Sequence, residues 1–336
     1  MNRYFNSTAD EQRIIIQQVA NKMILPPQAI EKDVWVTALV EIVFSLPFAD
    51  KLVFKGGTSL SKVWNVVERF SEDIDLSVDR QHFGLEGDLT KKQLKNLRKQ
   101  SSLFVKEEFC NALQNAINKY GLQDYCSIEV QPDGEGDSTY PEPRKIFIRY
   151  QSLFGKLDYL SSEIVLEIGA RALMEPTSKM FVRSFISENS DYDTSVTNSE
   201  IITIVPEKTF LEKAFLLHEI FTGTGSMKAD RKSRHLYDLE KMMDKDFAIK
   251  ALSDHELWNA IQHHRSIFTP IRGIDYTSNI RGNISIIPPK NIIDEWQQDY
   301  EMMQQTMIHG ESISFDKLLQ RLEELQERFR KFLNSS

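Results

Sequence analysis

A strand, a double-glycine turn and a strictly alternating strand follow one another early in the chain, and this succession constrains the fold more than any other feature. The apolar run Leu52–Phe54 is cut off by Gly56-Gly57, a pattern typical of a buried strand that enters a tight turn. Residues 59–69 have helical spacing, and residues 73–78 (Asp-Ile-Asp-Leu-Ser-Val) alternate polar and apolar side chains. The segment therefore predicts a helix flanked by two strands.

The alternation places Asp73 and Asp75 together on one face of their strand, with Ile74 and its apolar neighbours facing a core. Glycines let backbone N–H groups approach a triphosphate, and Thr58 or Ser59 would add hydrogen bonds. Two aspartates two residues apart on a strand suit Mg²⁺ or Mn²⁺, hard ions that prefer carboxylate and phosphate oxygens. The combination favours nucleotidyl transfer, in which one ion activates the attacking hydroxyl and another neutralises the leaving pyrophosphate.

Other interpretations of the same residues stay open. Gly56-Gly57 is an ordinary turn, and the aspartates face solvent, if their strand lies at the edge of a sheet. A metal-dependent nuclease would use the same aspartates without needing the turn, and a binding module would have lost the chemistry. Arg69 and Ser71, which flank the aspartates, are candidates for phosphate contacts; alternatively Arg69 pairs with Glu68 or Glu72 and Ser71 is a strand-entry hydroxyl.

Composition limits the class of protein. A chain of 336 residues is about twice the usual domain size, which predicts two lobes. The net charge of -8 argues against a protein that coats nucleic acid, so an RNA contact must be local. No apolar run approaches the roughly 18 residues of a membrane span and the N-terminus is polar, which favours a cytoplasmic protein without membrane contact. The densest basic surfaces are Lys91, Lys92, Lys95, Arg98 and Lys99, and Lys228, Arg231, Lys232 and Arg234.

The character of the chain changes at Val205-Pro206. Before it, helical and strand-like segments are mixed, and after it nearly all segments have helical period. This predicts an α+β fold with a mixed first lobe, residues 1–205, and a helical second lobe, residues 206–336. The expected helices are 9–23, 30–44, 90–120, 210–221, 237–243, 255–264 and 314–333; the further expected strands are 145–150 and 164–168, and residues 131–144 are expected to form a loop.

Five short stretches, taken together, resemble the AbiEii/AbiGii toxin nucleotidyltransferases, relatives of the MenT toxins in the DNA polymerase β-like superfamily. The resemblance implies a two-lobed transferase with a mixed-sheet N-terminal lobe, a helical C-terminal lobe that completes the active-site cleft, an NTP substrate and a divalent metal. The stretches are KGGTSLSK (55–62), RFSEDIDL (69–76), IVLEIGAR (164–171), FLEKAFLLHE (210–219) and SRHLYDL (233–239).

The resemblance also implies roles for individual residues. Gly57 and Ser59 fall in the nucleotide-binding turn and Asp73 and Asp75 are the metal carboxylates, whereas Lys213 and Asp238 match positions that the family treats as catalytic. Without the resemblance, Lys213 would be a solvated residue beside an apolar stripe, and Asp238 a helix cap or a surface partner of Lys241.

Two further positions are left with alternatives. Superfamily enzymes often have a third metal carboxylate, for which Glu167 is the candidate; pairing with Arg171 or Lys145 would satisfy it equally. Many members read Arg-Asp where this chain has Arg234-His235, so the role of His235 is open.

The function that the resemblance implies is transfer of a nucleotide from an NTP to the 3′ end of tRNA, by a toxin of a toxin–antitoxin or phage-defence system. The implied partner is an antitoxin of the AbiEi transcription-regulator type. The alternatives are a catalytically inactive nucleotide- or antitoxin-binding module and a metal-dependent nuclease.

Overall fold

A computed structural model describes residues 4–71, 73–155, 161–197 and 199–331. The chain forms two compact units, Met1–Trp64 with Phe70–Ile204 and Asn65–Arg69 with Val205–Ser336. The main division thus falls beside the composition change at Val205-Pro206. The short segment Asn65–Arg69 belongs to the second unit, which the sequence does not predict. The polar N-terminal residues 1–3 and Glu72 lie outside the described residues.

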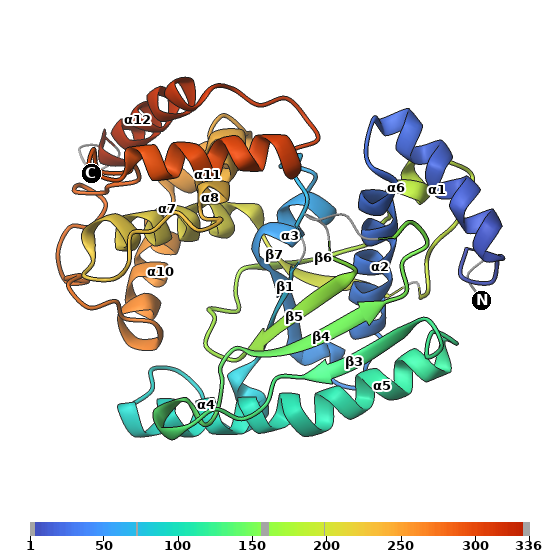
Figure 1. Cartoon of the computed structure of the whole chain (residues 1–336). Coiled ribbons are helices and arrows are strands. Elements are labelled where there is room, and N and C mark those ends of the chain that lie inside the picture. Colours follow the sequence, from blue (N-terminus) through green and yellow to red (C-terminus); the bar gives the residue numbers. More distant parts are fainter. Residues whose placement is uncertain (1–3, 72, 156–160, 198, 332–336) are drawn as a thin grey trace. The chain divides into compact units, whose positions relative to one another are not determined.

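Within the described residues, seven strands form one mixed sheet in the first unit, in the order β3-β4-β5-β2-β1-β7-β6 (Figure 1). The strand with the two aspartates, β2, lies in the middle of this order, so the alternative that placed the aspartates on an edge strand is wrong. β2 pairs antiparallel with β1 and parallel with β5. The bounds are β1 Leu52–Lys55, β2 Asp73–Val78, β3 Cys126–Val130, β4 Arg144–Tyr150, β5 Glu163–Gly169, β6 Thr177–Met180 and β7 Ile201–Ile204.

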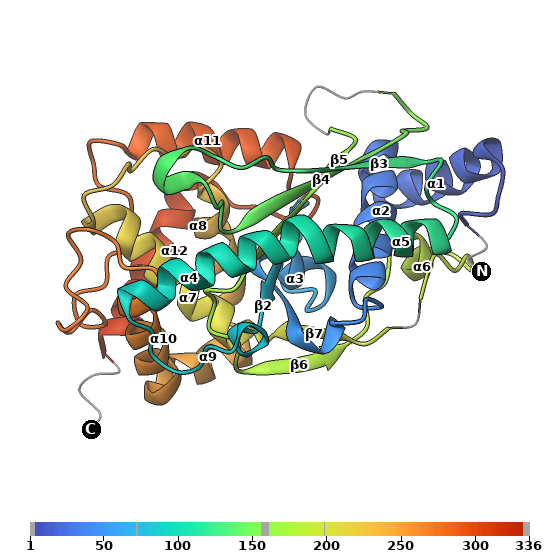
Figure 2. The same ribbon diagram turned by 90° about the horizontal axis from the view of Figure 1, so that it is seen from below.

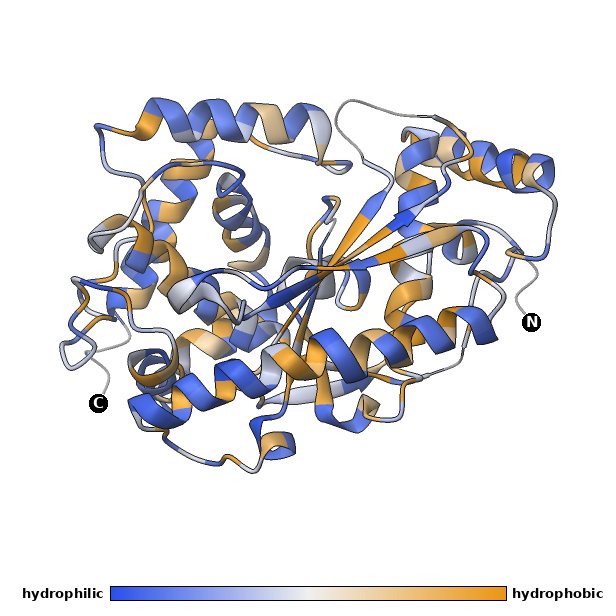
Figure 3. Ribbon diagram, turned by 60° about the horizontal axis from the view of Figure 1, so that its bottom comes forward, coloured by the Kyte–Doolittle hydropathy of each residue, from blue (hydrophilic) through white to orange (hydrophobic). Residues whose placement is uncertain are grey.

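Helices pack around this sheet. α2 is buried along nearly its whole length, and a continuous helical stretch, α4 and α5 joined by a π-helical turn at Val105–Phe109, runs across the strands (Figure 2). Hydrophilic and hydrophobic residues alternate in bands along α4 and α5, as expected for helices with one face on a core (Figure 3). The helices are α1 Ala9–Met23, α2 Pro27–Val43, α3 Gly56–Lys62, α4 Lys91–Phe104, α5 Cys110–Lys119 and α6 Phe185–Asn189.

Helix α3 differs from the prediction of a helix over 59–69. Its bounds are Gly56–Lys62: Gly56 enters the helix with a left-handed φ of 79°, and Asn65, beyond its end, has a positive φ of 50° that prevents a right-handed helix from continuing. The chain then enters the segment that belongs to the second unit. The double glycine therefore forms the first turn of the helix rather than a loop before it.

The second unit is helical, as predicted. Its core gathers large side chains such as Phe210, Leu217, Trp258, Trp296 and Phe329, all nearly inaccessible. Among the described residues, no helix combines the length and the apolar character that a membrane crossing requires. The helices are α7 Pro206–Thr222, α8 Ser233–Met242, α9 Asp246–Ser253, α10 His255–Phe268, α11 Ile293–Thr306 and α12 Phe315–Lys331.

Candidate functional site

The double-glycine turn lies directly against the aspartate strand. Gly56 has a φ of +79°, and a Cβ atom at this position would lie 2.1 Å from Oδ2 of Asp75. Only glycine permits both this backbone conformation and this approach. The fold thus places one of the two predicted metal carboxylates in contact with the predicted nucleotide-binding turn.

The hydroxyl groups of the turn are used within the protein. The Thr58 hydroxyl hydrogen-bonds the backbone carbonyl of Asp73 and lies 2.6 Å from the Ser71 hydroxyl, while Ser59 donates to the carbonyl of Gly56 at 2.9 Å. Thr58 and Ser59 are both almost inaccessible. The Thr58 hydroxyl fixes the turn to the start of β2 and the Ser59 hydroxyl bonds within the turn, so nucleotide contacts from the turn would have to come mainly from its backbone.

Charged side chains form a row across four neighbouring strands. The strand register places Lys55 opposite Asp75, Asp75 opposite Glu167, and Glu167 opposite Lys145. Lys145 Nζ lies 2.6 Å from Glu167 Oε1, and Lys55 Nζ lies 3.8 Å from Asp75 Oδ1. The hydrogen bond to Glu167, with Asp73 and Asp75 nearby, raises the pKa of Lys145. Two carboxylates at the centre of the row are therefore flanked by two ammonium groups.

Glu167 is satisfied in the way that one of its alternatives predicts, by Lys145; Arg171 pairs instead with Glu142. Glu167 lies opposite Asp75 on the neighbouring strand, so both side chains offer carboxylate oxygens of the kind that bind Mg²⁺. Among the described side chains, however, no group of three or more His, Cys, Asp or Glu residues converges on one point as a metal cage would. The arrangement fits a Mg²⁺ ion held by one or two carboxylates and completed by substrate phosphates and water.

A second cluster lies within the helical unit. Arg69 donates from Nε and Nη2 to the two oxygens of Asp238, each at 2.7 Å, and Lys213 Nζ lies 2.8 Å from Oδ2 of the same carboxylate. The side chains of Arg69 and Asp238 are at most 1% exposed. Asp238 is thus neither a surface partner of Lys241 nor a helix cap, and Lys213 is not solvated. The two nitrogens that Arg69 gives to Asp238 are not available for the predicted phosphate contact.

Two basic side chains meet the Asp238 carboxylate in this cluster. Burial favours the neutral form of Asp238, but Arg69 and Lys213 outweigh it and hold the pKa of the carboxyl well below its usual range. Burial and the nearby Arg69 lower the pKa of Lys213, although Asp238 opposes the shift. A buried ammonium or guanidinium group attracts anions such as phosphate.

His235, whose role the sequence leaves open, joins this cluster. Its Nδ1 atom lies 3.3 Å from Lys213 Nζ. Burial, followed by the charges of Lys213 and Arg234, lowers the pKa of His235 well below its usual value. The imidazole is therefore neutral, and its Nδ1 accepts a hydrogen bond from the lysine.

Sequence reasoning missed the buried charged residues of α2, one of which contacts the helix that begins at the turn. Helix α2 buries four charged side chains, Glu31, Lys32, Asp33 and Glu41, in an otherwise apolar segment. Buried charges are rare unless they are paired, so their presence in such a helix is a usable signal. Asp33 pairs with Lys62, the last residue of α3.

The predicted RNA-contacting lysines of α4 lie on the surface: Lys91, Lys92, Lys95 and Lys99 are exposed. Arg98 instead donates to the carbonyl of Tyr140 at 2.6 Å. The first unit also contains a cavity of about 370 Å³, lined by residues such as Glu41, Phe181, Arg183 and Tyr192, and none of the predicted site residues lines it.

Comparisons with known proteins identify the fold and the family of the chain. The solved structure of MenT4, a nucleotidyltransferase toxin from Mycobacterium tuberculosis H37Rv, superposes with a TM-score of 0.57 over 96% of this chain and 90% of its own, at 16% sequence identity. The likeness shows the fold. No curated protein matches the chain in sequence. The family model of the nucleotidyl transferase AbiEii toxins of type IV toxin–antitoxin systems matches residues 38–321, and the chain therefore belongs to this family.

Proposed function

We propose that this nucleotidyltransferase toxin transfers a nucleotide from an NTP to a hydroxyl group of RNA, with the 3′ end of a tRNA as the acceptor. The observation that carries the proposal is the contact between Gly56 and Asp75. It brings a turn whose backbone a nucleotide can approach next to a carboxylate that suits a metal ion. The choice of tRNA rests on the resemblance to the MenT branch.

In the proposed reaction the acceptor oxygen attacks the α-phosphorus of the NTP. A new oxygen–phosphorus bond forms, the bond between the α-phosphorus and the oxygen that bridges to the β-phosphate breaks, and pyrophosphate leaves with that electron pair. The acceptor proton passes to a carboxylate or to water. A bound divalent ion, which nucleotidyltransferases of this kind use generally and which we propose is Mg²⁺ or Mn²⁺, supplies positive charge for both oxygens.

The chain's own residues have separate parts in this proposal. Asp73 and Asp75 hold the ion, with Glu167 as the third candidate, and the backbone of Gly56 and Gly57 contacts the nucleotide. Lys213 contacts a β- or γ-phosphate as a point charge. Asp238 holds Lys213 in place, and the exposure of Lys213, 8% of its side chain, shows that it is not a surface lysine.

Transfer assays with labelled nucleotides test the proposal. Each α-labelled NTP is incubated with purified tRNA and with total RNA, in Mg²⁺ and in a chelator. Label on tRNA only in Mg²⁺ is expected; RNA fragments would indicate the nuclease, and an unchanged RNA would indicate the inactive binding module. Label on another RNA species would support nucleotidyl transfer but contradict the choice of tRNA as the acceptor.

The metal carboxylates have a matched control. Asp73→Ala and Asp75→Ala should each abolish transfer, because the loss of either aspartate leaves the charge and the position of the ion uncompensated. Asp50→Asn removes an exposed carboxylate of the same unit, paired with Lys51, and should leave transfer unchanged. Substantial turnover by either alanine variant would contradict the metal assignment.

The biological setting is proposed from the resemblance. We expect a partner antitoxin of the AbiEi type, a role in phage defence and a cytoplasmic location, where NTPs and RNA are available. Growth arrest on expression of the parent, relieved by Asp75→Ala and by the antitoxin, is the expected result.

A further inference from the structure

The seven-residue helix α3 carries the proposed nucleotide-binding turn at one end and a buried lysine at the other. A helix this short is not stable by itself, so its position depends on contacts with the rest of the first unit. At its first turn those contacts are Gly56 against Asp75 and Thr58 against the start of β2. The contacts at its last residue, Lys62, are the subject of this inference.

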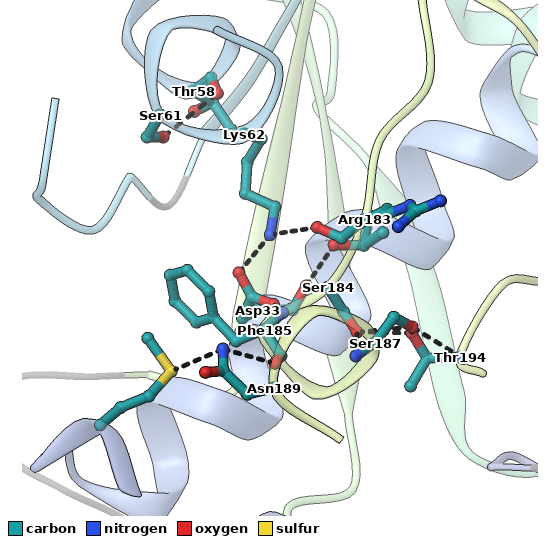
Figure 4. A network of polar contacts seen from close by, with 12 residues as sticks. Asp33, Thr58, Ser61, Lys62, Arg183, Ser184, Phe185, Ser187, Asn189 and Thr194 are labelled. Carbon is teal, nitrogen blue, oxygen red and sulfur yellow. Dashed lines mark hydrogen bonds and ion pairs between the residues drawn. The ribbon is translucent and has the colours of Figure 1, made fainter. Parts of the chain in front are cut away.

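Lys62 ends in a closed set of partners (Figure 4). Its ammonium group forms an ion pair with Oδ1 of Asp33 on α2, donates to the carbonyl of Arg183 at 3.0 Å, and lies 4.8 Å from the centre of the Phe185 ring. The side chains of Lys62 and Asp33 are only 9% and 3% exposed. A buried ion pair with additional partners holds both of its side chains, here Lys62 and Asp33, in one geometry.

The carboxylate of Asp33 also reaches a third helix. Its second oxygen accepts a hydrogen bond from the backbone N–H of Phe185, the first residue of α6, at 2.6 Å. The Phe185 ring in turn packs edge-on against Phe70, the residue directly before Ser71, whose hydroxyl contacts Thr58. Asp33 therefore links α2, α3 and α6, and the same network leads back to the start of β2.

We propose that the Asp33–Lys62 pair positions the double-glycine turn for nucleotide binding. The inference rests on the proposed function, since the nucleotide is the ligand that the turn would serve. Asp33 and Lys62 are positioning residues: neither contacts the nucleotide, and both act through the placement of α3. Within the described part of the chain, the Ser61 hydroxyl bonds carbonyls of its own helix and makes no such link.

A pair of variants separates positioning from stability. Asp33→Asn alone leaves the Lys62 ammonium buried without its counter-charge and should destabilise the protein. The double variant Asp33→Asn with Lys62→Met removes both charges and should recover much of that stability, because neutral replacement of a buried ion pair is often tolerated. If the pair only stabilises the fold, nucleotide affinity recovers with it; if it positions the turn, affinity stays low.

The measurements are thermal unfolding, equilibrium titration with each of the four NTPs in Mg²⁺, and hydrogen exchange of residues 56–62. We expect the double variant to unfold near the parent temperature, to bind the NTP about tenfold more weakly, and to exchange amide protons of residues 56–62 faster. Lys62→Arg, which keeps the pair, should retain most of the affinity. The control Lys179→Met with Glu200→Gln removes an exposed ion pair of the same unit and should change none of these values.

Parent-like nucleotide affinity or parent-like exchange of residues 56–62 in the double variant would overturn the inference. If the parent protein neither binds nor transfers nucleotides, the proposed function is wrong, and so is the part of this inference that concerns nucleotide binding. The exchange rates would still decide whether the pair holds the turn, so the two failures are distinguishable.

Discussion

At the scale of single residues, position 56 shows how closely the turn and the carboxylate depend on one another. Gly56→Ala imposes a left-handed conformation on an L-residue, which costs about 1–2 kcal/mol, and also pushes a methyl group into Asp75. We expect transfer to fall about a hundredfold, since a displacement near 1 Å at a reacting centre has effects of that size. Steady-state transfer rates measure it.

Gly84 provides the matched control for this prediction. It has a similar φ of +67°, but a Cβ atom there would meet nothing within 4 Å. Gly84→Ala should therefore lower the free energy of unfolding by about 1 kcal/mol and leave transfer unchanged. Equal losses of activity in the two variants would show that strain, rather than displacement of Asp75, is responsible.

The cluster at Asp238 leads to a prediction about stability. Asp238→Asn leaves Arg69 and Lys213 buried without a counter-charge and should cost about 3 kcal/mol or more of unfolding free energy. Lys213→Met leaves the neutral Arg69–Asp238 pair intact and should cost less. Denaturant unfolding of both variants measures the difference. If Asp238→Asn is as stable as the parent but inactive, Asp238 has a direct part in the reaction rather than a supporting one.

These residues also show what the sequence can predict at this scale. The alternation in residues 73–78 is a local pattern, and it correctly places Ile74, Leu76 and Val78 in the core. The partner of Arg69 lies 169 residues away along the chain, so no local pattern indicates it. Both oxygens of Asp238 accept from Arg69, and such a bidentate pair suits a buried guanidinium better than a single contact with an acid that is merely near in sequence.

At the scale of elements, local periodicity identifies the long helices and the strands with regular patterns. It misses β6, which consists of Thr-Ser-Lys-Met and has no apolar alternation, and β7, which is only four residues long. It also misses α11. The buried residues of this helix, Trp296, Tyr300 and Met303, have helical spacing, but they are too few in a polar sequence to give a clear signal. Short strands depend on their neighbours in the sheet, so their own residues carry little signal.

Helix α2 leads to a prediction about pH. Burial raises the pKa of Glu41 to about 7, against the hydrogen bonds that it accepts from the backbone N–H groups of Val196 and Thr197; Asp193 adds to the increase. The pKa of a glutamate in the unfolded chain is about 4.3. Between this pH and about pH 7, the carboxyl of Glu41 therefore keeps its proton in the folded state and loses it in the unfolded state. The contribution of Glu41 therefore lowers the free energy of unfolding as pH rises through this window.

The measurement is the free energy of unfolding in denaturant at pH 5.5 and at pH 7.5. The parent should lose more stability between these values than Glu41→Gln, which cannot ionise and keeps one oxygen to accept from the loop. The comparison isolates Glu41 from the other titrating groups, which both proteins share. Identical losses in the two proteins would show that Glu41 is ionised throughout the window.

At the scale of the whole molecule, the proposed RNA acceptor would need a local positive surface on this acidic protein. The lysines of α4 meet this need in an unusual place: Lys91 and Lys92 lie in the first turn of the helix, where the helix dipole disfavours positive charge. They therefore do not stabilise α4, whose N-terminus is capped by Thr90 and Gln93. A role in binding an external anion explains their position better than a role in folding.

Replacement of four exposed lysines by glutamine, Lys91, Lys92, Lys95 and Lys99, should weaken RNA binding and leave NTP binding intact. Arg98 stays in place because it holds the carbonyl of Tyr140. If all four lysines contact phosphates, the slope of log affinity against log salt should fall by about 3. The control replaces Lys245, Lys250, Lys290 and Lys317, which are also exposed, and changes the net charge equally. The same loss in both variants would indicate an effect of net charge alone, and no loss in the first would move the acceptor contact to the surface around Lys228 and Lys232.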